Sequence, residues 1–280
     1  MLSYDLHQHL WPEALIEGLR ARRELPRLKG SLLELPSGDS EIDLAAHTLE
    51  ARLALLDRDE IDVAVVSLPP TLELDEELVE AYHEGIAEVV DASGGRLRAL
   101  ASGSFREGFA GSCVPAWDLA GLVALEPLLG ELERHGSLLF VHPGPAAVPA
   151  DGPEWWPAVV DYTTQMQAAY AAWIALYADR WPDLRVVFAI LAGGAPFQLE
   201  RLASRGVDTR GVVRPNVFLD TASYGERALE LSLATYGVAQ LVYGSDAPVI
   251  DSEPTLRSIR GFGQAVADVV CRENPARLLQ

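Results

Sequence analysis

The chain has 280 residues, 49% of them hydrophobic, a length that suits one α/β barrel as well as two smaller domains. A net charge of −19, from 41 acidic and 22 basic residues, argues against a protein that binds nucleic acid or an anionic membrane. The chain has two cysteines, and its longest apolar run, residues 168–178, is too short to span a bilayer. The start shows no signal-peptide pattern, so we expect a cytoplasmic protein that acts on a small molecule.

Strand and helix patterns alternate along the chain, which predicts parallel βα units. The expected strands are residues 4–9, 61–68, 97–101, 109–114, 138–142, 184–190, 217–221 and 241–245. The expected helices are residues 13–23, 47–59, 73–91, 122–135, 158–180, 196–204, 226–236, 256–270 and 274–279. Segments 25–43 and 144–157 are expected to be long loops. Eight strands, with a helix missing after the third, predict a single-domain (β/α)8 barrel over residues 1–280.

The first strand carries a candidate metal site. Side chains two residues apart on a strand share a face, so Asp5, His7 and His9 project together. The two imidazoles can grip one divalent metal, and Asp5 can orient the rings by accepting a hydrogen bond. An HxH pair is a weak signal by itself, because satisfied core histidines are common at such spacing.

Two further strand ends complete the set. His142 ends the fifth strand, and Asp246 ends the eighth, which closes beside the first. Catalytic groups of such barrels come from the C-terminal ends of strands. Three histidines and one carboxylate make a zinc set with an open position for water.

These motifs resemble the amidohydrolase superfamily. The runs that carry the resemblance are YDLHQHLWP, LLFVHPG, LVYGSDAP and CRENPARLL. They are similar to the amidohydrolase-related group, which includes aminocarboxymuconate-semialdehyde decarboxylase. The resemblance implies a (β/α)8 barrel holding one divalent metal, usually zinc with manganese as the alternative, through His7, His9, His142 and Asp246. It also implies either hydrolysis of an amide or ester-like bond, or non-oxidative decarboxylation.

The chain departs from the family at the end of the sixth strand. Members usually carry a histidine there, within a pattern like FAHGGG, where this chain has Ile190 in FAILAGG. Strand alternation with Val186 and Phe188 predicts that Ile190 points into the barrel, where it can neither bind metal nor activate water.

We expect a metal-dependent hydrolase, in which the metal lowers the pKa of bound water from 15.7 to about 7. Asp246 is then the remaining candidate to accept the proton, and the alternative is that it serves only as a ligand. Two other functions stay open. One is a decarboxylase that uses the same metal site. The other is a protein that still binds the metal and a ligand but has lost catalytic activity.

Aromatic and basic residues near the expected site predict how a substrate is held. Trp11, Trp155 and Trp156 predict an apolar or aromatic substrate, unless they pack beneath the loops. Arg52 could bind a substrate carboxylate, although an exposed arginine is the simpler expectation. The helix around residues 168–178 is apolar on nearly every face, which predicts a homodimer, or a terminal helix that covers it.

Overall fold

The computed structural model describes residues 1–122 and 124–280. Eight strands follow one another in chain order around a parallel sheet. They are β1 (Tyr4–His9), β5 (Val63–Ser67), β6 (Leu97–Ser102), β7 (Gly111–Pro115), β8 (Leu138–His142), β9 (Arg185–Phe188), β10 (Val217–Asp220) and β11 (Leu241–Val242). The N–H of Leu6 donates to the carbonyl of Tyr243 at 2.9 Å, and Gln8 pairs with Ala247. These contacts bring the last strand against the first, and the predicted (β/α)8 barrel is confirmed.

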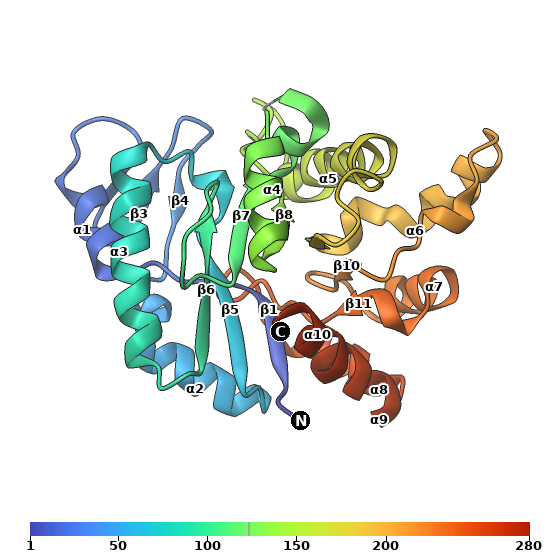
Figure 1. Cartoon of the computed structure of the whole chain (residues 1–280). Coiled ribbons are helices and arrows are strands. Elements are labelled where there is room, and N and C mark those ends of the chain that lie inside the picture. The colour runs from blue at the N-terminus through green and yellow to red at the C-terminus, as the bar shows by residue number, and fades with distance from the viewer. Residues whose placement is uncertain (123) are drawn as a thin grey trace.

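Helices surround the strands (Figure 1). They are α1 (Glu13–Ala21), α2 (Leu49–Asp59), α3 (Glu76–Ala92), α4 (Glu126–His135), α5 (Tyr162–Ala172), α6 (Ile190–Ala203), α7 (Glu226–Tyr236), α8 (Glu253–Gly261), α9 (Gln264–Asp268) and α10 (Asn274–Leu278). Residues 103–110, between β6 and β7, form turns and no helix, as predicted. The predicted helix 122–135 corresponds to α4, and its residue 123 is not among the described residues. No described helix has the length and apolarity needed to cross a membrane.

Local chemistry sets the ends of these helices. The carboxylate of Asp75 accepts the N–H of Leu78 and caps the start of α3, which buries Leu78, Tyr82 and Ile86 against the barrel. Each large apolar side chain buried in this way stabilises the fold by about 1.5–3 kcal/mol. Helix α4 ends where Gly136 takes the left-handed conformation, at φ 61°.

Segment 25–43 differs from the expected loop. It forms a small antiparallel sheet of β2 (Arg27–Lys29), β3 (Leu32–Glu34) and β4 (Ser40–Glu41). The side chains of Leu28 and Leu33 are buried beneath it. Strands of two or three residues are too short to show a period of two, so this sheet could not be read from the pattern.

The chain around Ile190 also differs from expectation. Strand β9 ends at Phe188, and Ile190 and Leu191 have left-handed φ values of 46° and 50°. The expectation that Ile190 continues the alternation of the strand is therefore wrong. Its side chain is buried, and it is not among the residues that line the pocket over the strand ends that carry His9, His142 and Asp246. A Cβ at Gly193 would lie 2.2 Å from the carbonyl oxygen of Thr163, so only glycine lets α6 approach α5 this closely.

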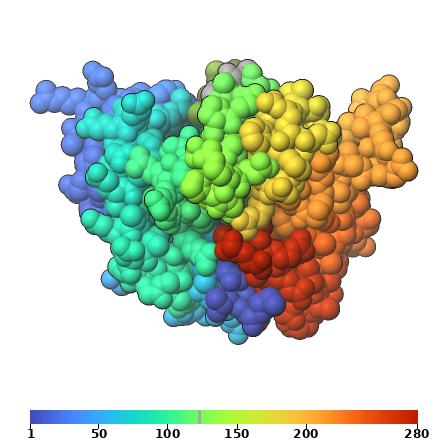
Figure 2. Space-filling model, viewed as in Figure 1, coloured from blue at the N-terminus to red at the C-terminus, as the bar shows by residue number. Residues whose placement is uncertain are grey.

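The apolar segment 168–178 packs partly inside the protein. Helix α5 lies against α6, and Tyr170 and Trp173 are buried, whereas 56% of Leu176 is exposed. Nearby, α6 presents Phe197, which is 72% exposed, and the end of this helix projects from the body of the molecule (Figure 2). Helix α10 packs against β1 and β11. The cover on α5 is thus α6 rather than a terminal helix.

Candidate metal centre and pocket

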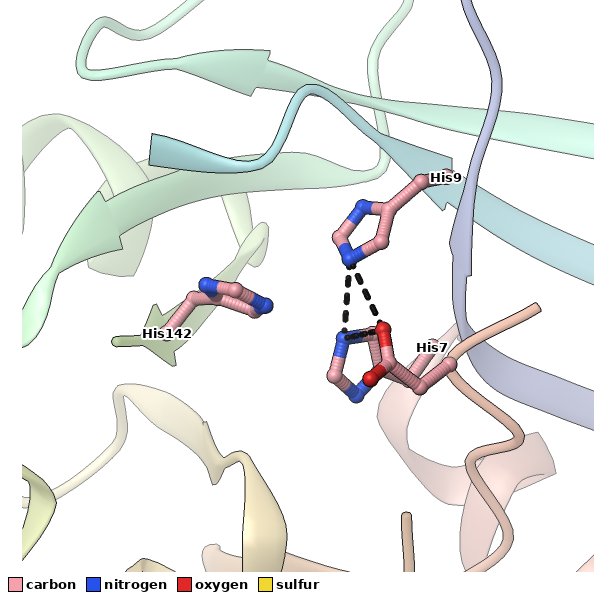
Figure 3. Close-up of side chains that lie close together, drawn as sticks. His7, His9 and His142 are labelled. Atoms are coloured by element: carbon pink, nitrogen blue, oxygen red, sulfur yellow. Dashed lines mark hydrogen bonds and ion pairs between the residues drawn. The ribbon is translucent and has the colours of Figure 1, made fainter. Parts of the chain in front are cut away.

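Four side chains meet at the C-terminal ends of the strands. His7, His9, His142 and Asp246 each offer a ligand atom, and these atoms all lie within 4.8 Å of one another. The Nε2 atoms of His7 and His9 are 3.3 Å apart, and Oδ1 of Asp246 lies 3.1 Å from Nε2 of His9. The three rings turn toward a common centre (Figure 3). The structure thus brings together the four residues that the sequence predicted to meet, while their role as ligands stays a prediction.

Backbone contacts aim Asp246 at the histidines. Asp246 has a left-handed φ of 64°, which Asp tolerates better than most residues, and its N–H donates to the carbonyl of His7 at 2.8 Å. Gly244 lies two residues earlier, and a Cβ there would lie 2.7 Å from the Cβ of His7. Glycine is therefore what allows the segment after β11 to lie this close to β1.

A hydrogen bond fixes the outer nitrogen of each ring. Nδ1 of His7 lies 2.7 Å from Oδ2 of Asp220, at the end of β10. Nδ1 of His9 lies 3.2 Å from the carbonyl of Ser67, and Nδ1 of His142 lies 2.8 Å from the carbonyl of Pro143. When each Nδ1–H donates to its oxygen, each Nε2 is left with a lone pair directed at the centre. This is the tautomer that a metal ligand needs.

The donor set fits a divalent ion. Two ligands at zinc distances of ~2.0–2.1 Å and a tetrahedral angle stand about 3.3 Å apart. The Nε2 atoms of His7 and His9 have this separation. Imidazole nitrogens with one carboxylate suit zinc, and manganese is also compatible with nitrogen and oxygen ligands.

Asp220 performs the role that we expected of Asp5. The carboxylate of Asp5 accepts the backbone N–H groups of His7 and Ser245, at 3.1 and 3.0 Å, and the side-chain amide of Gln8. Asp5 therefore joins β1 to the segment after β11 and does not orient the rings. Burial raises its pKa to about 6, against the lowering effect of these hydrogen bonds. Asp220 was missed, although its place at the end of a predicted strand was a usable signal.

Two carboxylates set the charge of the cluster. Burial lowers the pKa of His7, but the carboxylates of Asp220 and Asp246 outweigh it and raise the pKa to about 9. Burial lowers the pKa of both His9 and His142. Burial raises the pKa of Asp246, but the neighbouring imidazoles of His7 and His9 lower it more, so Asp246 is a carboxylate at neutral pH. The carboxylates thus favour a positive charge on His7, whereas burial disfavours one on His9 and His142.

Arg52 is buried, and the expectation of an exposed arginine is wrong. Its side chain is 0% exposed. Nη2 donates to the carbonyl of His9 at 2.7 Å, and Nη1 donates to Gln8 Oε1 at 2.8 Å and to the carbonyl of Ala247 at 3.3 Å. Burial lowers the pKa of Arg52 to about 10, so it stays charged. It holds together the two segments that carry His9 and Asp246, and it does not line the pocket over the cluster.

A pocket of about 660 Å³ opens over the cluster, within the usual size of a small-molecule site. His9, His142 and Asp246 lie at its base. Parts of segments 33–43 and 146–158 form its walls, so the small sheet and the loop after β8 both border the pocket.

The three tryptophans that we expected around a substrate do not all lie at the pocket. Trp11 is buried and lines the pocket. Trp155 is 57% exposed, and its ring stacks on that of Trp156 with centroids 6.2 Å apart. Neither of these two is among the lining residues. Only Trp11 of the three thus contributes to the pocket wall.

His47 also lines the pocket, and its role was missed. It ends the 3-10 turn Leu44–His47, and its ring stacks on Trp11 with centroids 4.8 Å apart and planes at 25°. The N–H of Trp11 donates to Nδ1 of His47 at 3.1 Å. Burial lowers the pKa of His47 to about 3, so the imidazole is neutral. From the sequence, His47 was expected to begin a helix and make a local contact, at an end that could approach the active face, and its stacking on Trp11 was not predicted.

A closed (β/α)8 barrel with three imidazoles and a carboxylate gathered at its strand ends has the architecture of a barrel enzyme with a candidate metal site at this rim. The family model described as Amidohydrolase matches residues 4–280. The chain therefore belongs to the amidohydrolase family.

Known proteins similar to this chain include several decarboxylases. The chain is 24% identical over 286 residues to a 2-amino-3-carboxymuconate-6-semialdehyde decarboxylase of Dictyostelium discoideum, covering 85% of this chain and 78% of that protein. The 5-carboxyvanillate decarboxylase of Sphingomonas paucimobilis matches with a TM-score of 0.75 at 18% identity, over 99% of this chain and 98% of that one. The enzyme of the same name from Novosphingobium aromaticivorans, with bound manganese and 3-methoxy-4-hydroxy-5-nitrobenzoic acid, matches with a TM-score of 0.75 at 17% identity, over 99% and 97%. At these identities the structural likeness shows the fold.

Proposed function

We propose that this chain is a metal-dependent, non-oxidative decarboxylase of a small aromatic or unsaturated carboxylic acid. The proposal rests on the four-residue cluster at the base of the pocket, which fits one divalent ion, zinc or manganese. The decarboxylase names of the related proteins support this reaction over the hydrolase that we first expected. Two buried, unpaired thiols, Cys113 and Cys271, agree with a cytoplasmic location.

The contacts of Asp220 weigh against water activation. Its two oxygens are engaged by Nδ1 of His7 and by the N–H groups of Ile190 and Ala222, at 2.7, 2.8 and 3.0 Å. It is therefore not a free base for water. Among the described residues at the base of the pocket, Asp246 is the remaining carboxylate that could move a proton.

Decarboxylation breaks the bond between the carboxylate carbon and its neighbour, releases carbon dioxide, and leaves an electron pair that takes up one proton. A metal held by His7, His9, His142 and Asp246 would supply positive charge that binds the acid and stabilises this electron pair. Asp246, a carboxylate at neutral pH, would take up a proton from solvent and pass it to the carbon, as well as serve as a ligand. Trp11 provides an apolar wall for the planar part of the substrate.

The test is product analysis with metal-loaded protein and a panel of hydroxylated aromatic acids, amides and lactones. We expect carbon dioxide release without incorporation of labelled water oxygen into the organic product. His142→Ala should lose both metal and turnover, whereas the exposed His135→Ala, at the end of α4, should lose neither. Incorporation of labelled oxygen into product would identify a hydrolase, and tight binding without turnover would identify a binder.

We also propose that the protein is a homodimer that uses the exposed parts of α5 and α6. Leu176 and Phe197 are large apolar side chains on this side of the barrel, and both are mostly exposed. Light scattering at micromolar concentration should report twice the chain mass. A monomer would contradict the assembly and would leave the proposed reaction untouched.

A further inference from the structure

The charged residues of the pocket all have the same sign. Among the described residues that line it, five carry carboxylates and none is Lys or Arg. Asp246 belongs to the cluster at the base. The other four are exposed and lie along the walls: Asp39, Glu41, Asp43 and Glu154.

These four wall carboxylates are only weakly compensated by cations. Arg27 of the small sheet attracts Asp39 through space, but the ion pairs of Arg27 and Lys29 are both with Glu34. Within residues 1–122 and 124–280, no Lys or Arg forms an ion pair with any of the four. A cleft lined by one sign of charge focuses its field on whatever enters it.

His47 supplies a polar contact of a different kind. It is 8% exposed, lines the pocket, and accepts the N–H of Trp11 on Nδ1. A ring that accepts on Nδ1 carries its proton on Nε2. No described residue bonds to Nε2, which leaves an N–H donor for an oxygen of a bound molecule. The pocket therefore offers a neutral donor near its base and negative charge along its walls.

We propose that this pocket selects monocarboxylates whose remaining part is neutral or positively charged, and that it rejects acids with a second carboxylate. The proposal rests on the proposed function, because the single carboxylate is the group that the metal would hold. The substrate class is thus a hydroxylated or amine-bearing aromatic or unsaturated monoacid. His47 would donate to an uncharged oxygen of this molecule.

Simple electrostatics gives the expected size of the effect. A unit charge roughly 10 Å from another, near a protein surface, changes a dissociation constant by about tenfold before salt screening. Several wall carboxylates act together on a second anionic group, while salt at physiological strength screens beyond about 8 Å. A discrimination of about tenfold at low salt, shrinking as salt is added, is the expected scale.

The test compares three derivatives of 2-hydroxybenzoate that differ only at carbon 5, which carries a carboxylate, a hydroxymethyl or an aminomethyl group. Their dissociation constants for manganese-loaded protein are measured by calorimetry at low and high salt. We expect the hydroxymethyl and aminomethyl probes to bind at least about tenfold more tightly than the dicarboxylate at low salt. The dicarboxylate binding as tightly as the others would overturn the proposal, and so would binding of none of the three.

Two triple variants locate the effect. The first, D39N/E41Q/E154Q, removes wall charge and leaves Asp43, which caps the turn before His47. The second, E84Q/E88Q/D91N, removes the same charge from exposed positions of α3 and serves as the control. In the first variant, the dissociation constant of the dicarboxylate should fall to within about threefold of that of the hydroxymethyl probe. The second variant should leave the difference between these two dissociation constants in place. Equal effects of the two variants would overturn the assignment to the wall.

Binding and turnover are read separately. Carbon dioxide release is measured on the same three probes. Absence of release with the binding order intact would contradict the decarboxylase and leave the charge selection standing.

Discussion

Nδ1 of His7 lies 2.7 Å from Oδ2 of Asp220, and both side chains are fully buried. The two residues are 213 positions apart in the chain. The carboxylate holds the ring with Nε2 facing His9, His142 and Asp246. The contact between β1 and β10 thus sets the tautomer of a candidate metal ligand.

Asp220→Asn tests that contact. The amide keeps an oxygen for the N–H groups of Ile190 and Ala222, but it would donate to Nδ1 of His7 and move the ring proton to Nε2. We expect metal affinity to fall by about 10- to 100-fold, as for other lost partners of metal-bound histidines. Titration with a competing chelator measures this, and unchanged affinity would show that Asp220 has only a structural role.

Asp246→Asn tests proton transfer. The amide can still offer an oxygen to the ion but cannot carry a proton, so turnover should fall by about 100-fold or more at matched metal occupancy. Occupancy must be matched because the loss of a charged ligand also weakens metal binding. A near-normal rate of carbon dioxide release in the metal-replete variant would leave Asp246 as a ligand alone.

Arg52→Met tests the buried arginine. The change removes the donor from the carbonyl of His9 and from Gln8, and each buried acceptor left unpaired costs about 1–3 kcal/mol. We expect urea unfolding to show a loss of about 3 kcal/mol, with weaker metal binding. Arg227→Met is the control, since Arg227 is 88% exposed and should change stability little. Equal stabilities of the two variants would refute the role given to Arg52.

Trp11→Ala and Trp155→Ala test whether the substrate binds in the pocket or on the outer loop. Trp11 lines the pocket and stacks on His47, so its loss should weaken binding of an aromatic acid by about 3- to 10-fold. Trp155 is more than half exposed and outside the lining, so its removal should change affinity by less than about twofold. Thermal melting checks that both variants fold. A larger effect at Trp155 than at Trp11 would place the substrate on the outer loop.

The positions that meet at the strand ends could be read from the chain alone. The two-residue spacing of His7 and His9 places both rings on one face because strand side chains alternate. His142 and Asp246 follow two other strands, and all parallel strands of a barrel end at one rim. These inferences need only local periodicity and the order of elements.

The surroundings of that cluster were decided by the tertiary structure. The burial of Arg52, the partner of His7 and the stacking of His47 on Trp11 depend on segments far apart in the chain. Ile190 left the strand pattern because β9 ends at Phe188 and the chain then turns through left-handed conformations toward α6. The sequence by itself determined which side chains reach the rim, because alternation and strand order are local properties. Barrel closure and packing decided what holds those side chains and what charge surrounds them, because these depend on contacts that local patterns do not encode.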